Sequence, residues 1–130
     1  MKKFLLLVVG ASCLLLITAC SNSSSDNAEG SKLIQVEVKP VQETLQPGRA
    51  ILIDAHVTQG SENVTDAQEV KFEIWKKDEE QHKTITAAHW QDGVYRIKTI
   101  FPGDGTYYVI AHVTARDMHV MPQKELIVGG

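Results

Sequence analysis

Cysteine is scarce in this chain of 130 residues: Cys13 and Cys20 are the only two, and both lie within the first twenty positions. Downstream of Cys20 there is no thiol. For that part of the chain this excludes a disulfide framework, a cysteine nucleophile and dithiol redox chemistry. A metal site there has to use histidine, methionine, carboxylate or backbone oxygen as its ligands.

Basic residues and phosphate-binding signals are also few. The whole chain has 13 Lys+Arg against 16 Asp+Glu, and leaving out Lys2 and Lys3 changes the formal charge from −3 to −5. No basic stripe could neutralise phosphates, so we do not expect nucleic acid as a partner. A Gly-rich phosphate loop and a recognisable Ser/His/Asp arrangement are missing as well, and we therefore do not expect an enzyme.

The N-terminus has the features of an exported protein. Two lysines precede an apolar run that ends in ITAC at residues 17–20. A positively charged start followed by such a run is an export signal, and ITAC resembles a lipobox, the cleavage and acylation motif of bacterial lipoproteins. We expect residues 1–19 to be a lipoprotein signal peptide. Cys20 then becomes the lipidated N-terminus, which holds the protein on the extracytoplasmic face of the cell membrane.

Residues 20–32 are expected to form a flexible linker behind the lipid. The stretch SNSSSDNAEGS at 21–31 has no large apolar side chain, so it cannot bury enough surface to offset the entropy lost on ordering. About a dozen residues of this kind have a root-mean-square reach of roughly 20 Å. The domain that follows, residues 33–130, therefore stays close to the membrane.

The rest of the chain has the pattern of an all-β domain. Runs of β-branched and aromatic residues are separated by Gly, Pro, Asn and Asp, without a helical period. Asp92-Gly93 between two such runs is a good type I′ hairpin signal. Seven short strands at this spacing are typical of an antiparallel immunoglobulin-like sandwich. The predicted strands are 33–38, 49–58, 69–75, 83–90, 94–101, 106–114 and 120–128.

One short motif sets which side chains face inward. DGTY at 104–107 resembles the tyrosine corner that opens the sixth strand of such sandwiches. Because side chains alternate along a strand, we expect Tyr107, Val109, Ala111 and Val113 to point inward, and Tyr108, Ile110, His112 and Thr114 to face out. Trp75 and Trp90 are expected to be packing residues. Further core positions are expected at Ile51, Ile53, Ala55, Val57, Phe72 and Ile74.

Soft and neutral donor side chains gather in AHVTARDMHVMP, residues 111–122. Strands that run alternately up and down bring the ends of the even-numbered strands and the starts of the following ones to one end of the sandwich. His82 maps to the opposite end. The donors that map to the shared end are His56, His89, His112, Met118, His119 and Met121.

The loop between the last two strands decides which of these donors face the same way. If Arg116 and Asp117 form a two-residue turn, His119 lies opposite Thr114 and Met121 opposite His112. His112, His119 and Met121 then project from one face, with opposed Cβ atoms about 5 Å apart. A three-residue loop reverses His119 and Met121, and the sequence leaves both loop lengths open.

Imidazole and thioether together, without thiolate, indicate copper, either Cu(I) or Cu(II), more than zinc or calcium. The group His112, His119 and Met121 is the strongest candidate, and His89 is weaker. His56 is expected on the opposite sheet. Met118 falls on the wrong face if the turn has two residues. The competing interpretation is that these histidines are only solvated and that the methionines fill gaps in the packing.

Several stretches resemble the YtkA-like (FixH-like) domain of bacterial lipoproteins. They include FEIWKK, AAHWQDGVY and FPGDGTYYV, and the most specific is H-V-T-A-x-x-x-H-x-M-P at His112 to Pro122. The resemblance covers roughly residue 35 to the C-terminus. It implies an immunoglobulin-like domain on the outer side of the cytoplasmic membrane that handles copper for the assembly of respiratory haem-copper oxidases. His89, His112, His119 and Met121 match its motif positions.

Two hypotheses of different class follow. The first is a lipid-anchored copper chaperone that passes copper to a respiratory oxidase subunit or another copper protein in the same membrane. The second is a binding or adhesion module of immunoglobulin-like fold that contacts a protein partner without any metal.

Overall fold

The computed structural model describes residues 32–130. The predicted signal peptide, the lipid-bearing Cys20 and all of the predicted linker before Lys32 lie outside the described residues. Every regular element of the described part is a β-strand, and no helix among residues 32–130 is long and apolar enough to cross a membrane. The prediction of an all-β sandwich is confirmed.

Residues 32–130 form ten strands where the sequence predicts seven. The predicted strand 83–90 divides into β5 and β6, the predicted strand 120–128 starts earlier and divides into β9 and β10, and β3 is an addition. The strands are β1 (Ile34–Pro40), β2 (Ala50–Gln59), β3 (Glu62–Asn63), β4 (Glu69–Lys76), β5 (Lys83–Thr86), β6 (Ala88–Gln91), β7 (Val94–Ile100), β8 (Gly105–Ala115), β9 (Met118–Val120) and β10 (Gln123–Val128).

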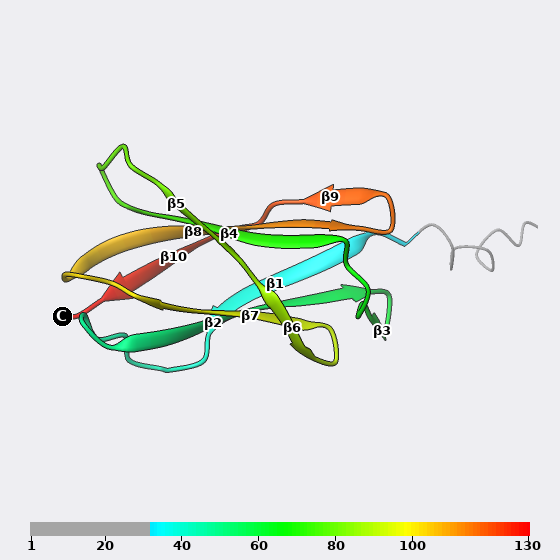
Figure 1. Cartoon of the computed structure of the whole chain (residues 1–130), viewed down its shortest axis with the longest axis horizontal. Coiled ribbons are helices and arrows are strands. Elements are labelled where there is room, and N and C mark those ends of the chain that lie inside the picture. The colour runs from blue at the N-terminus through cyan, green and yellow to red at the C-terminus, as the bar shows by residue number, and fades with distance from the viewer. Residues whose placement is uncertain (1–31) are drawn as a thin grey trace, which may run out of the picture.

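The strands form two five-stranded antiparallel sheets that pack face to face (Figure 1). The β2 sheet has the order β1-β2-β7-β6, with β3 paired to β2. The β8 sheet has the order β10-β8-β4-β5, with β9 paired to β8. The predicted strand 83–90 divides because β5 pairs with β4 and β6 pairs with β7, so the chain crosses between the sheets at Ala87.

The core follows from the strict alternation of side chains along β2, β4 and β8. In each strand the alternate apolar residues are buried and their neighbours are half-buried on the outer face. All ten predicted core positions are buried, as are Val64, Val70 and Phe101. The ten are Ile51, Ile53, Ala55, Val57, Phe72, Ile74, Tyr107, Val109, Ala111 and Val113.

Two buried tyrosines fasten loops to this core. The Tyr107 hydroxyl donates to the Gly103 carbonyl oxygen at 2.9 Å, which confirms the predicted tyrosine corner. The Tyr95 hydroxyl donates to the Val64 carbonyl oxygen at 3.0 Å and accepts from the Ala67 amide at 3.0 Å. Because both oxygens are satisfied, the loops before β4 and β8 are held in place without an unpaired buried hydroxyl.

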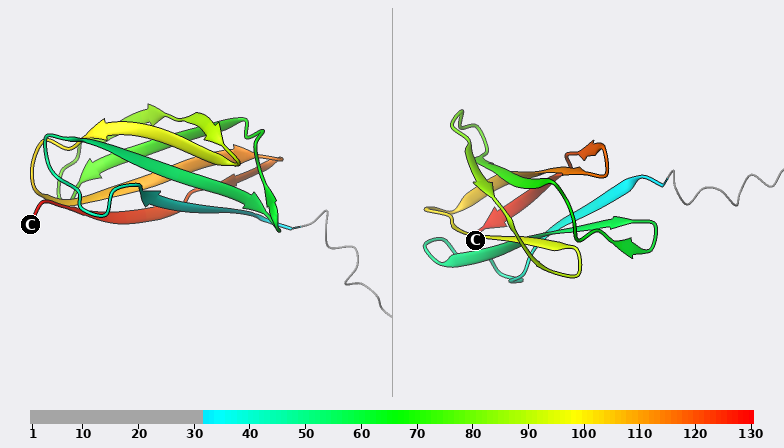
Figure 2. Two further views of the ribbon diagram at one scale, coloured as in Figure 1. Left: turned by 90° about the horizontal axis from the view of Figure 1, so that it is seen from below. Right: turned by 45° about the vertical axis from the view of Figure 1, so that its right-hand side comes forward.

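The predicted donors lie toward the end of the sandwich at which β1 begins. Figure 2 shows the β8–β9 hairpin and β3 at this end and the C-terminus at the other. The two sheets are joined there by Arg116, whose guanidinium donates to Gln59 and Glu62, each at 2.8 Å, and to Asp66 at 3.3 Å. These contacts favour the guanidinium's charged form and raise the pKa of Arg116, with the Glu62 hydrogen bond as the largest cause.

Candidate metal site

The β8–β9 connection is a two-residue turn. Arg116 and Asp117 have φ angles of 51° and 65°, which are the left-handed values that a type I′ turn requires at both central positions. Ala115 therefore lies opposite Met118, and Thr114 lies opposite His119. This is the shorter of the two loop lengths that the sequence leaves open, and it is the one that turns His119 to the outer face.

Met121 and Pro122 interrupt the strand without changing its register. Val120 pairs with Val113 before the interruption, and Gln123 pairs with Ile110 after it. Met121 consequently lies at the position opposite His112. Its side chain is 52% exposed. A thioether this open to solvent can meet an ion without any rearrangement of the core.

The imidazole rings of His112 and His119 are neighbours on this outer face. Their centroids are 6.0 Å apart, with the planes inclined by 38°. Two imidazoles that share one ion at metal–nitrogen distances of about 2.0–2.1 Å have centroids about 5–6.5 Å apart. The observed spacing therefore fits two rings that bind the same ion, and Met121, opposite His112 in the register, is the third candidate soft donor.

One nitrogen of each ring is already engaged. The Nε2 atom of His112 lies 2.8 Å from Oε1 of Glu73 on β4. The Nδ1 atom of His119 lies 2.9 Å from the Thr114 hydroxyl on β8. The remaining nitrogens, Nδ1 of His112 and Nε2 of His119, are the ones that can bind an ion while these contacts persist.

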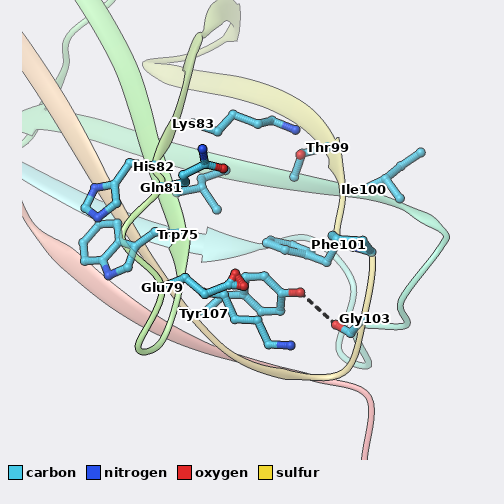
Figure 3. Close-up of a pocket in the computed structure, with 13 residues that line it drawn as sticks. Trp75, Glu79, Gln81, His82, Lys83, Thr99, Ile100, Phe101, Gly103 and Tyr107 are labelled. Atoms are coloured by element: carbon cyan, nitrogen blue, oxygen red, sulfur yellow. Dashed lines mark hydrogen bonds between the residues drawn. The ribbon is translucent and has the colours of Figure 1, made fainter.

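Glu73 and His82 are the neighbours of the site that the sequence analysis missed. The second oxygen of Glu73 is 2.5 Å from Nδ1 of His82, whose ring stacks on Trp75 at a centroid distance of 4.2 Å (Figure 3). His82 lies in the loop toward the opposite end of the sandwich, as predicted, but its side chain reaches back along the sheet and is joined to His112 through one carboxylate. The alternation along β4 places Glu73 on the outer face; only the packing of the 77–82 loop brings His82 to it.

The electrostatics of Glu73 follow from these two contacts. Hydrogen bonds from His82 and then His112 hold the pKa of Glu73 below its ordinary value, and partial burial opposes them only in part. The carboxylate is therefore ionised at neutral pH. Its side chain is 26% exposed, so the pair of hydrogen bonds is partly shielded from solvent.

Behind the stack of His82 and Trp75, a cavity of about 490 Å³ opens between the sheets. Phe101 and Tyr107 line it together with residues of the 79–83 segment, as Figure 3 shows. Of the predicted metal ligands within residues 32–130, none lines this cavity. The candidate site is thus an open patch on the outer face of the β8 sheet.

The other predicted ligands do not join this group. His56 lies on the β2 sheet, where its Nε2 atom is 2.9 Å from the Asn63 side-chain oxygen. His89 lies on β6 of the same sheet, and its Nε2 atom accepts from the Gly93 amide at 3.3 Å. Met118 packs against the core.

These three placements have two geometric causes. Proximity to the same end of the sandwich is not enough, because the two outer faces point away from each other. Met118 is excluded by alternation, since its neighbour His119 occupies the outer face.

The interpretation that Trp90 is a packing residue is also wrong: its side chain is 51% exposed.

The candidate site has few potential ligands. Within residues 32–130 no cluster of three or more His, Cys, Asp or Glu side chains is arranged to hold a metal ion. A thioether is not among those side-chain types, and the candidate consists of two imidazoles and the thioether of Met121. Such a set suits a soft ion in an exchangeable site better than a tightly held structural ion.

The fold and the candidate site together define a class: a small antiparallel β-sandwich with a His/His/Met patch on one outer face. The YtkA-like family model matches residues 28–112. This chain belongs to the YtkA-like family. The matched segment includes His56, His89 and His112 and ends before His119 and Met121, so the candidacy of those two residues rests on the hairpin geometry.

A solved structure supports the fold alone. The crystal structure of an engineered protein at 1.98 Å resolution superimposes with a TM-score of 0.54 at 18% sequence identity, over 73% of this chain and 20% of that chain. The chain thus spans about a fifth of the length of that structure. No curated protein matches the chain.

Proposed function

We propose that this protein is a lipid-anchored copper-binding chaperone that delivers copper for the assembly of a haem-copper respiratory oxidase. The observation that carries the proposal is the 6.0 Å separation of the His112 and His119 rings, with Met121 opposite His112 on the same face. Two imidazoles and a thioether match the preferences of Cu(I), and imidazole also serves Cu(II).

The openness of the patch supports transfer rather than storage. Met121 is 52% exposed, and His119 lies on the surface. A recipient can therefore approach the ion directly and replace these ligands one at a time. The chain's role in this proposal is to bind and hand over the ion, without catalysing a reaction.

Placement relative to the membrane supports the same role. β1 begins at Ile34, which pairs with Gln59 at the end of β2, and Gln59 in turn accepts from Arg116 of the hairpin turn at 2.8 Å. The patch therefore lies toward the end of the domain that continues into the predicted linker and Cys20. A linker with a reach of roughly 20 Å keeps the patch near membrane proteins and raises its effective concentration for them.

A second candidate function rests on Trp90. This side chain is 51% exposed on β6, and the Arg96 guanidinium lies 3.8 Å from its ring centroid. Trp and Arg are enriched at protein interfaces, although the Arg96 side chain is itself partly buried. They favour a binding module that contacts a protein partner through the β2 sheet without metal.

The test of the first function uses the mature chain, residues 20–130, produced with Cys20→Ser. Cu(I) and Cu(II) are titrated separately into this protein and into the triple variant His112→Ala/His119→Ala/Met121→Ala. We expect one copper ion per chain and its loss in the triple variant. His56→Ala/His89→Ala is the matched control, because it removes two histidines from the same end of the sandwich.

A cellular experiment tests the delivery step. A strain that lacks this gene is complemented with the full-length chain or with the triple variant, and the copper content of its terminal oxidase is measured. Restoration by the native chain and not by the variant supports delivery. Equal restoration by the native chain and the triple variant contradicts delivery. If the triple variant restores the oxidase and a Trp90→Ala chain does not, delivery is also contradicted and the second function is favoured.

A further inference from the structure

A carboxylate bridges two imidazoles across the outer face of the β8 sheet. Oε1 of Glu73 meets Nε2 of His112 at 2.8 Å, and Oε2 meets Nδ1 of His82 at 2.5 Å. The three residues come from β8, β4 and the loop that precedes β5. His82 is held in turn by its stacking on Trp75, with an angle of 5° between the planes.

The chemistry of a carboxylate restricts what each ring can do. An ionised carboxylate can only accept hydrogen bonds, so both contacting ring nitrogens have to carry hydrogens. In the neutral imidazole only one nitrogen carries a hydrogen. A neutral His112 in this contact is therefore the Nε2–H tautomer, with its lone pair on Nδ1.

We propose that Glu73 is a positioning residue that makes Nδ1 of His112 the copper ligand, and that His82 holds Glu73 in place for this purpose. The inference rests on the proposed copper function and adds to it the ligand atom and the residues that select it. A hydrogen bond from a ligating imidazole to a carboxylate fixes the ring orientation and increases the basicity of the ligand.

The contact of His119 differs in kind. Its Nδ1 atom meets the Thr114 hydroxyl at 2.9 Å, and a hydroxyl can donate as well as accept. Thr114 therefore leaves the tautomer of His119 adjustable, whereas Glu73 fixes that of His112. The tautomer of His112 is thus fixed before the ion binds, whereas that of His119 can adjust when the ion binds.

His82 also keeps Glu73 from binding the ion itself. Both carboxylate oxygens are engaged, one by each imidazole. The patch consequently presents two nitrogens and one sulfur. This selects against ions that prefer oxygen ligands, and removal of His82 frees one carboxylate oxygen.

The first test needs no metal. Nitrogen-15 NMR of the metal-free chain reports the tautomer of His112 and any protected Nε2–H proton. We expect the Nε2–H tautomer with a protected proton in the native chain, and loss of that proton in Glu73→Ala. Glu125→Gln is the matched control, because Glu125 is an exposed acidic residue on the same sheet. A native chain with Nδ1–H, or an unchanged proton in Glu73→Ala, overturns the proposal.

The second test measures binding. We expect Glu73→Ala to weaken Cu(I) binding by about 10–100-fold and Glu125→Gln to leave it unchanged. We expect His82→Ala to raise the affinity for Zn(II) relative to Cu(I), and the double variant His82→Ala/Glu73→Gln to reverse that rise. An equal Cu(I) affinity of Glu73→Ala and the native chain overturns the positioning role. No gain of Zn(II) affinity in His82→Ala overturns the role of His82.

The two tests separate this inference from the copper function. If the metal-free chain shows the expected tautomer but binds no copper, the copper function fails and Glu73 still positions the ring. If copper binds and the nitrogen whose resonance shifts is Nε2 of His112, the copper function stands and the positioning role fails. Circular dichroism confirms that each variant is folded.

Discussion

The outer faces of the two sheets make an informative contrast. On the β2 sheet, polar side chains pair with one another. Arg96 donates to both carboxylate oxygens of Asp54 at 2.6 and 2.9 Å, and the His56 ring is hydrogen-bonded to the Asn63 side chain. On the β8 sheet, Glu73 contacts His112 and His82, and Met121, opposite His112 in the register, is exposed. The two faces therefore differ in that the proposed copper ligands His112, His119 and Met121 belong to only one of them.

The contrast also shows why location along the chain is a poor guide to a metal site. His56 and His112 both lie toward one end of the sandwich, yet they project from opposite outer faces. His112 and His82 are thirty residues apart, yet both contact the same carboxylate. The face from which a side chain projects matters more than its distance from the end of its strand.

The largest expected effect comes from lengthening the β8–β9 turn. Insertion of one glycine between Arg116 and Asp117 allows β9 to slip by one residue, which turns His119 away from the outer face. We expect Cu(I) binding to weaken by about 100-fold, at the upper end of the changes seen when the surroundings of a metal site are altered. Competition with a Cu(I) chelator measures the affinity.

The β2 sheet provides the control for this insertion. Asp92 and Gly93 form the matching turn between β6 and β7, with φ angles of 48° and 81°. A glycine inserted there perturbs a similar hairpin that carries His89. If this second insertion weakens copper binding as much as the first, the two faces do not differ in the way described.

The next effect concerns the structural pair on the β2 sheet. Asp54→Ala leaves the Arg96 guanidinium without its bidentate partner in a partly buried position. We expect the free energy of unfolding to fall by about 1–2 kcal/mol while the copper stoichiometry is unchanged. Urea denaturation followed by Trp fluorescence measures the first quantity. A loss of copper binding in this variant indicates that the faces are coupled.

A smaller effect is expected from the pH dependence of stability. Hydrogen bonds from His82 and His112 lower the pKa of Glu73 in the folded state. The contribution of Glu73 to the free energy of unfolding is therefore present above its unfolded-state pKa and is lost as the pH falls through its folded-state pKa. In the metal-free chain, Glu73→Gln should be less stable than the native chain near pH 7 and equally stable in strong acid. A constant difference in melting temperature between pH 7 and pH 3 contradicts this assignment.

The smallest effect is expected at the hairpin turn. Asp117 has a φ of 65°, a conformation that glycine adopts at lower cost. Asp117→Gly should raise stability by no more than about 0.5 kcal/mol, because the gain is offset by greater freedom in the unfolded chain. Thermal unfolding detects the change. Copper binding should be unaffected, since the register and the outer face are the same.

Much of the fold follows from local sequence patterns. Alternation along 50–59 and 105–115 sets the buried residues of β2 and β8, and DGTY predicts the tyrosine corner. The crossing of β5 into β6 was not predictable from the run 83–90, because a continuous β pattern does not specify which sheet each half joins. The interruption at Met121 and Pro122 was missed for a similar reason: the pairing register continues on both sides of it.

The sequence by itself determined that residues 33–130 are an all-β domain without thiols, and that His112, His119 and Met121 lie close together along the chain. Those properties depend on composition and on the two-residue period of a strand, which are local. Tertiary structure alone decided the turn length, the separation of His56 and His89 from the site, and the meeting of His82 with Glu73. Each of these depends on which strands pair and how a loop folds back, and such long-range contacts are not encoded in any short stretch of the chain.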